Sequence, residues 1–234
     1  MTNTSEACAR PVRDTWRLAN AAIVGLALII GLAAGVWLAP NPWPAAPAWL
    51  RGWTFQAHQL SALIVALVEF AVVAAVVLLI CKGRRIRNPL SSFSWNLNRH
   101  ALPSIAIGIA FAALVDALMG IGHMEVMSFT DRLAALNILL YIAGAVAVQP
   151  FVEECYFRGI LFMAISTKLG RVGTVTLTAF AFALVHVGGY RLLPLFFSLG
   201  VVAAIVRIKT RSVASCFAFH AAYNFALLVL PFGR

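Results

Sequence analysis

The stretch LSALIVALVEFAVVAAVVLLI, residues 60–80, carries one charged side chain, that of Glu69. As a helix it would be about 30 Å long, which matches the hydrocarbon thickness of a bilayer. A helix that is apolar on every side belongs in lipid or deep inside a large protein. Because the whole chain has only 234 residues, the stretch predicts a transmembrane helix.

The composition extends this prediction to the whole chain. Hydrophobic residues make up 62% and charged residues 11%, whereas a soluble domain is about half apolar and a quarter charged. We therefore expect an all-α polytopic membrane protein, a bundle of seven or eight transmembrane helices around an intramembrane polar cavity. The predicted spans are residues 18–38, 60–80, 101–120, 133–148, 151–167, 172–187, 192–206 and 213–230.

The net charge of +10 follows the membrane pattern and not that of a nucleic-acid-binding protein. Basic residues gather beside the apolar spans, where they orient helices and contact anionic lipid. They place the N-terminus and the 82–99 loop on the cytoplasmic side: Arg10, Arg13, Arg17, Lys82, Arg84, Arg85, Arg87 and Arg99. We expect an uncleaved first helix, a lipid bilayer as partner and no nucleic acid.

The charge rule gives conflicting answers after residue 148. If residues 151–167 cross the bilayer completely, then Arg207, Lys209 and Arg211 lie outside, against the bias. If they do not, these three residues lie inside and the C-terminus lies outside. The conflict arises because Gln149-Pro150 is expected to interrupt the helical pattern, since proline lacks a backbone donor.

A proline-rich stretch follows the first predicted span. Residues 39–59 contain four prolines together with Trp43, Trp49 and Trp53. Aromatic residues of this kind concentrate at membrane interfaces. The stretch therefore predicts an interfacial loop.

Four of the eight acidic residues lie inside or at the edge of apolar spans. A carboxylate in a bilayer is costly and is a functional candidate by default. Glu69 and Asp116 stand alone, and we expect them to bond across helices to Ser, Thr or His and so fix packing. A role in proton relay is the alternative.

Glu153 and Glu154, in contrast, have a charged residue nearby. Arg158 follows Glu154 by four residues, so the two share a helix face and can pair. Glu153 points about 100° away and is free to face a cavity. This arrangement favours a paired, supporting Glu154 and a Glu153 that serves as general base, although a purely structural cluster would show the same spacing.

Two histidines and an asparagine in the same half of the chain favour catalysis over that structural alternative. His186 ends the 172–187 span, while His220 lies in the last span with Asn224 one turn later on the same face. A single histidine in an apolar helix is usually a packing residue. Together these residues supply a partner for an attacking water and donors for an oxyanion.

Three motifs, QPFVEECYFRGILF at 149–162, FALVH at 182–186 and HAAYN at 220–224, resemble the CPBP family. This family comprises the CAAX-protease and bacteriocin-processing membrane proteins, also called the Abi family. Its pattern is EExxxR, then FxxxH, then His followed four residues on by Asn. The resemblance covers about residues 132–230, so residues 1–131 are expected to form three N-terminal helices and 132–230 a catalytic core.

The resemblance implies an intramembrane endopeptidase of the glutamic type. It implies that Glu153 activates water with help from His186, and that His220 and Asn224 stabilise the oxyanion. Glu154, paired with Arg158, would be a supporting carboxylate. No cofactor and no metal are expected.

Other mechanisms and functions stay open from the sequence. Glu153, His186 and His220 could hold a catalytic zinc ion. Cys216 precedes His220 by one turn, so a cysteine nucleophile beside an imidazole is a further alternative. Cys155 occupies a variable position of the family and is not expected to be a nucleophile. A non-catalytic immunity-type membrane protein and a small transporter are the functional alternatives.

The substrate is defined only by class. We expect a hydrophobic peptide or membrane-anchored protein, such as an exported peptide or a C-terminal sorting signal. The high Ala and Arg content suggests a bacterial source and hence the inner membrane, where a prenylated substrate is not expected.

Overall fold

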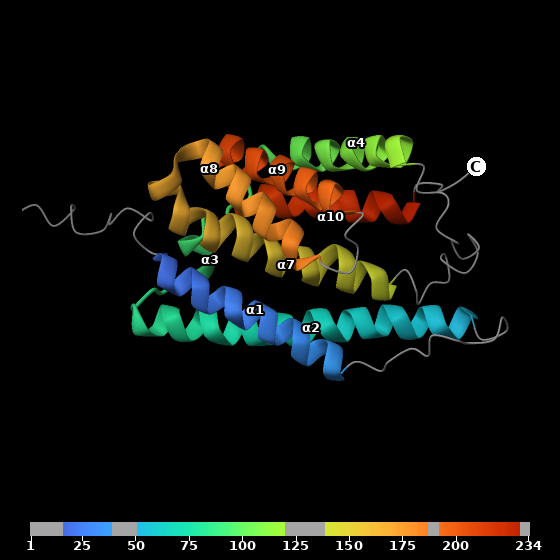
Figure 1. Cartoon of the computed structure of the whole chain (residues 1–234), viewed down its shortest axis with the longest axis horizontal. Coiled ribbons are helices and arrows are strands. Elements are labelled where there is room, and N and C mark those ends of the chain that lie inside the picture. Colours follow the sequence, from blue (N-terminus) through green and yellow to red (C-terminus); the bar gives the residue numbers. More distant parts are fainter. Residues whose placement is uncertain (1–15, 39–50, 120–138, 187–191, 230–234) are drawn as a thin grey trace, which may run out of the picture.

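The structure, a computed structural model, describes residues 16–38, 51–119, 139–186 and 192–229 (Figure 1). These ranges contain helices and no strand. The elements are α1 (Leu18–Leu38), α2 (Arg51–Gly83), α3 (Pro89–Ser92), α4 (Ala101–Met119), η5 (Ile142–Val148), α7 (Gln149–Glu154), η6 (Cys155–Leu161), α8 (Phe162–Val185), α9 (Leu193–Thr210) and α10 (Val213–Val229).

The prediction of an all-α polytopic membrane protein is confirmed. Five apolar helical segments of the described ranges are long enough to cross a bilayer, and Val213–Leu228 is a shorter apolar helix. Many large hydrophobic side chains on these helices are exposed, among them Leu79, Leu102 and Val172. Such an extended apolar exterior fits a lipid environment.

Most predicted spans agree with the helices to within a few residues, and α1 has the predicted limits. The predicted loop 39–59 was wrong from residue 51 onwards, because α2 begins at Arg51 and includes Trp53. Residues 51–59 contain no proline, so the helix extends past its apolar core. The prolines of the loop, Trp43, Trp49, Arg10 and Arg13 lie outside the described residues.

The predicted interruption at Gln149-Pro150 was also wrong. The helix continues from residue 139 to residue 169 through η5, α7, η6 and the first turns of α8. We call this segment the central helix. At about 1.5 Å per residue it is longer than one bilayer thickness, so a single tilted passage accommodates it.

The physical reason for the continuity lies in the π-helical turn before Pro150. In such a turn each carbonyl accepts from the amide five residues later, as Gly144 does from Gln149. The next carbonyl, of Ala145, would face the missing amide hydrogen of Pro150. Asn224 of α10 donates its Nδ2 to Ala145 O at 2.7 Å, so the carbonyl is satisfied and the helix continues.

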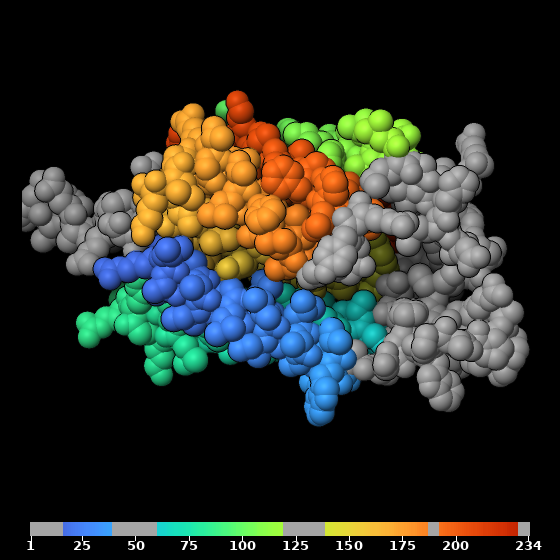
Figure 2. Space-filling model, in the orientation of Figure 1, coloured from blue at the N-terminus to red at the C-terminus, as the bar shows by residue number. Residues whose placement is uncertain are grey.

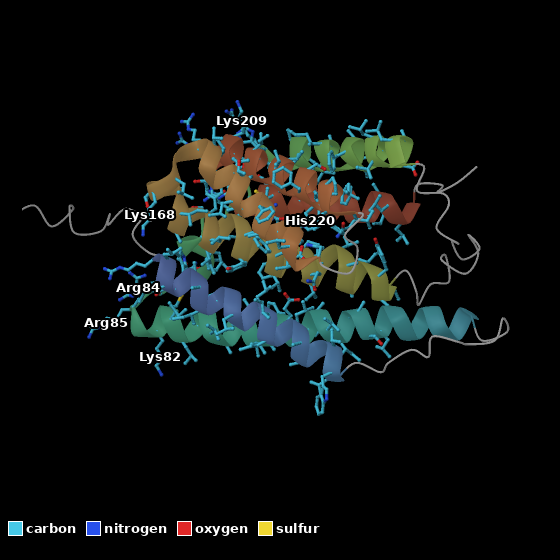
Figure 3. All side chains as sticks on the ribbon, in the orientation of Figure 1. Lys82, Arg84, Arg85, Lys168, Lys209 and His220 are labelled. Carbon is cyan, nitrogen blue, oxygen red and sulfur yellow. The ribbon has the colours of Figure 1, made fainter. Side chains whose placement is uncertain are left out.

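The chain reverses direction at Gly170, whose φ of 63° and ψ of −174° are not helical. Figure 1 shows α8 returning beside the central helix. The described part therefore contains seven helical passages. The conflict over Arg207, Lys209 and Arg211 disappears, because α9 ends on the same side as the 82–99 loop; Figure 3 shows Lys82, Arg84, Arg85, Lys168 and Lys209 at one end of the molecule.

The central helix lies between two groups of helices. Figure 1 shows α1 and α2 on one side of it and α4, α8, α9 and α10 on the other, and the space-filling view in Figure 2 shows α1 and α2 below α8 and α9. Glycines bring the neighbouring helices close: a Cβ at Gly31 of α1 would lie 2.8 Å from Glu69 Cα of α2, and one at Gly200 of α9 would lie 2.8 Å from Ala179 Cα of α8. Small residues commonly permit such close approach between membrane helices.

Candidate active site

The predicted pair of Glu154 and Arg158 is present in the central helix. Arg158 Nη1 lies 3.2 Å from Glu154 Oε1, and both side chains are fully buried. Arg158 also donates Nη2 to the carbonyl oxygen of Gly200 at 3.1 Å and stacks over the Phe182 ring at 4.6 Å. A buried ion pair requires such additional partners, so this pair holds the central helix against α8 and α9.

His220 of α10 completes the environment of Glu154. Its Nδ1 lies 3.0 Å from Glu154 Oε1. A carboxylate oxygen in an ion pair accepts, so Nδ1 carries the hydrogen. Glu154 Oε1 therefore lies close to two donors, and its supporting role stays a prediction.

Glu153 lies between two histidines from different helices. Its Oε1 is 3.7 Å from His186 Nε2, and its Oε2 is 3.8 Å from His220 Nδ1. Both distances exceed those of direct hydrogen bonds. Glu153 is 5% exposed, so these polar neighbours dominate its surroundings.

The ring of His186 is held in one orientation. Its Nδ1 lies 2.7 Å from the carbonyl oxygen of Phe182, and Phe196 of α9 stacks on the ring at a centroid distance of 4.3 Å. A carbonyl only accepts, so Nδ1 carries the hydrogen. In the neutral ring, Nε2 is then an acceptor directed toward Glu153.

Two further residues belong to this cluster: Gln149, which was not predicted, and Glu69, which was predicted to fix packing or to relay protons. Gln149 donates through Nε2 to Glu153 Oε1 at 2.9 Å and to Glu69 Oε2 at 3.0 Å. The amide nitrogen therefore lies between two carboxyl groups from different helices. The spacing of four residues between Gln149 and Glu153 could have predicted their contact on one helix face. Glu69 bonds across helices as predicted, with Gln149 as its partner in place of Ser, Thr or His.

Asn224 is positioned one turn from His220, but its described hydrogen bonds lead elsewhere. One side-chain amide hydrogen goes to Ala145, as above, and its backbone carbonyl accepts from Tyr141 Oη at 3.1 Å. The second amide hydrogen is available to a ligand. Asp116 of α4 makes no hydrogen bond or ion pair with another described residue, so its role stays a prediction.

Two alternative chemistries were open from the sequence: a catalytic zinc ion and a cysteine nucleophile. In the described ranges, no three His, Cys, Asp or Glu side chains are grouped as a metal site. Cys216 is fully buried, and its Sγ lies 3.3 Å from Ser212 O and 3.5 Å from Ala203 O. The hydrogen bonds described for this thiol therefore go to backbone carbonyls.

Comparison with known proteins gives one match, which lies in the C-terminal half of the chain. No curated protein and no solved structure matches the chain. The family model described as type II CAAX prenyl endopeptidase Rce1-like matches residues 135–226, which include the cluster of Glu153, Glu154, His186 and His220. Over these residues the chain is thus similar to the Rce1-like family, in agreement with the CPBP resemblance.

Proposed function

We propose that this protein is an intramembrane endopeptidase that hydrolyses a peptide bond with a water activated by Glu153. The observation that carries the proposal is the separation of 3.7 Å between Glu153 Oε1 and His186 Nε2. This distance is too long for a direct bond but lets one water oxygen lie within hydrogen-bonding distance of both atoms. Such a water would be held by two acceptors, as a nucleophile requires.

In the proposed reaction, Glu153 takes a proton from this water while the water oxygen attacks the carbonyl carbon of the substrate. The carbonyl π electrons move to the oxygen, which becomes an oxyanion. Collapse of this intermediate breaks the C–N bond, and the proton on Glu153 passes to the leaving amine. The products are a carboxylic acid and an amine, so atoms and charge balance.

The oxyanion needs preset donors, because removing one such donor typically costs a factor of about 10²–10³ in rate. His220 is the proposed first donor. Its Nδ1–H is directed to Glu154, so donation from Nε2 requires the protonated ring, which would lie beside the carboxyl groups of both Glu153 and Glu154. Asn224 is the proposed second donor, through the amide hydrogen that Ala145 does not use.

The proposed substrate is a hydrophobic peptide or a membrane-anchored protein. Glu153 and His220 are buried within the bundle, so recognition would take place inside it. We infer that the basic end shown in Figure 3 is cytoplasmic and that the membrane is a bacterial inner membrane. Exported peptides and C-terminal sorting signals are the proposed physiological targets.

Comparison of membrane proteomes tests the proposal. Cells with the wild-type chain should contain processed C-termini that are replaced by unprocessed ones in cells with Glu153→Gln or His186→Ala. Both variants should reach the membrane in normal amounts. If the three strains contain equal amounts of the chain and its variants but have identical C-termini in their membrane proteins, the chain is not a peptidase.

A further inference from the structure

A cavity lies at the basic end, away from the carboxylate cluster. It has a volume of about 580 Å³ and lies between α8, α9 and the segment before α4. Its wall includes Arg171, Arg207, Arg211, Ser94 and Thr174. The cavity is thus bordered by three guanidinium groups and by hydroxyl groups.

No carboxylate of the described residues lines this cavity. The acidic residues of the described ranges are Glu69, Asp116, Glu153 and Glu154, and none of them lines the cavity. No ion pair joins Arg171, Arg207 or Arg211 to a described residue. Clustered cations without counter-charges repel one another, so an anion in the cavity would lower the free energy of the folded chain.

Arg207 gives the cavity a fixed donor group. Its residue is only 8% exposed, and its Nε donates to the carbonyl oxygen of Arg158 at 3.0 Å. Within the described ranges, the terminal nitrogens Nη1 and Nη2 have no hydrogen-bond partner. The planar guanidinium group is therefore held in place with donors still available, which suits bidentate binding of a phosphate.

The position of the cavity favours a phospholipid headgroup as the phosphate-bearing ligand. It lies where α9 ends and where the chain reverses at Gly170, at the end of the bundle that carries the basic residues (Figure 3). Phospholipid headgroups lie at this level of a bilayer. Phe162, Met163 and Ile208 also line the cavity, and they offer an apolar wall to the upper part of an acyl chain.

We propose that this cavity binds the headgroup phosphate of an anionic phospholipid, with Arg207 as the fixed ligand and Arg171 and Arg211 as outer ligands. The site is separate from the proposed peptidase centre. Arg207 is linked to that centre through its hydrogen bond to the backbone carbonyl of Arg158. Lipid binding is measured without a substrate, so its failure would leave the peptidase proposal untouched.

The test is the thermal unfolding midpoint of the purified full chain in a neutral detergent, titrated with phosphatidylglycerol or with inorganic phosphate. A ligand that binds the folded state raises this midpoint. The pocket variant is Arg171→Gln/Arg211→Asn, at two exposed positions. The matched control is Lys82→Gln/Arg85→Asn, which removes the same charge at the same end; Arg85 and Arg211 both have a positive φ.

We expect phosphatidylglycerol to stabilise the wild type and the control alike, and the apparent Kd of the pocket variant to rise about tenfold or more. Arg207→Lys, which keeps the charge but loses the planar group, should weaken binding in the same direction. Equal weakening in pocket and control variants, or unchanged binding in both pocket variants, would overturn the site. Equal stabilisation by inorganic phosphate would overturn the lipid as its occupant.

Discussion

Asn224 donates its side-chain amide to the carbonyl oxygen of Ala145 at 2.7 Å, and so supplies the hydrogen that Pro150 lacks. A residue expected to serve catalysis therefore also stabilises the central helix. The two roles are separable, because only the structural one depends on the proline.

A double-mutant cycle separates them. Asn224→Ala should lower the unfolding free energy of the wild type by about 1–3 kcal/mol, since it leaves a polar group unsatisfied. In a Pro150→Ala background the loss should be smaller, because the new amide hydrogen can reach Ala145. Unfolding by detergent titration measures both losses, and equal losses would contradict the account; activity should fall in both backgrounds if Asn224 also binds the oxyanion.

The two adjacent glutamates should respond differently to the same substitution. Glu153→Gln should reduce the rate constant of peptide hydrolysis by a factor of about 10² or more with little effect on stability. Glu154→Gln should lower stability by about 3–5 kcal/mol, because it leaves Arg158 buried without its counter-charge. Single-turnover kinetics and detergent titration distinguish the two, and a stable, inactive Glu154→Gln would reverse the assigned roles.

Gln149 should act as a positioning residue for Glu153. Gln149→Leu removes both amide hydrogens, which frees the Glu153 carboxylate to rotate and should reduce kcat by a factor of up to about 10² with KM little changed. Gln149→Asn shortens the side chain while keeping its chemistry and serves as the comparison. A Gln149→Leu variant with wild-type kcat would show that the amide plays no part in orientation.

Neither thiol chemistry nor zinc should be needed for activity. Cys155→Ala and Cys216→Ala should hydrolyse the substrate at near wild-type rates, because both thiols are buried and that of Cys216 lies against backbone carbonyls. Metal analysis of purified protein, with activity measured before and after a strong chelator, addresses the zinc alternative. Activity that is lost on chelation and restored by zinc would replace the glutamic mechanism with a metal-dependent one.

The close contact between α1 and α2 should tolerate no side chain at Gly31. Gly31→Val places its Cβ within 2.8 Å of the Glu69 backbone and should destabilise the bundle by about 1–3 kcal/mol. Gly83→Val is the control, since nothing lies within 4 Å of its Cβ position. Similar unfolding midpoints for the two variants would show that α1 and α2 are not closely packed in the membrane.

Features set by neighbouring residues could be predicted from the sequence, whereas features set by residues distant in sequence could not. The thickness of a bilayer sets the length of an apolar run, so the limits of α1 were predictable, and helix geometry alone predicted the pairing of Glu154 with Arg158. The interruption at Pro150 was wrongly predicted because its compensation comes from Asn224, distant in sequence. The link from Gln149 to Glu69 was missed for the same reason, whereas the convergence of the motifs on one cluster could be expected only from the family resemblance.

Glu153 lies near the middle of the central helix, roughly 20 Å from either end. A peptide bond that reaches this depth in a regular helix has its carbonyl oxygen bonded within the helix. If the proposed function holds, a helical substrate would have to unwind over about one turn before it could react. The polar groups around Glu153 would then compensate the exposed amides, so that intrinsic ease of unwinding, more than side-chain identity, would decide which segments are cut.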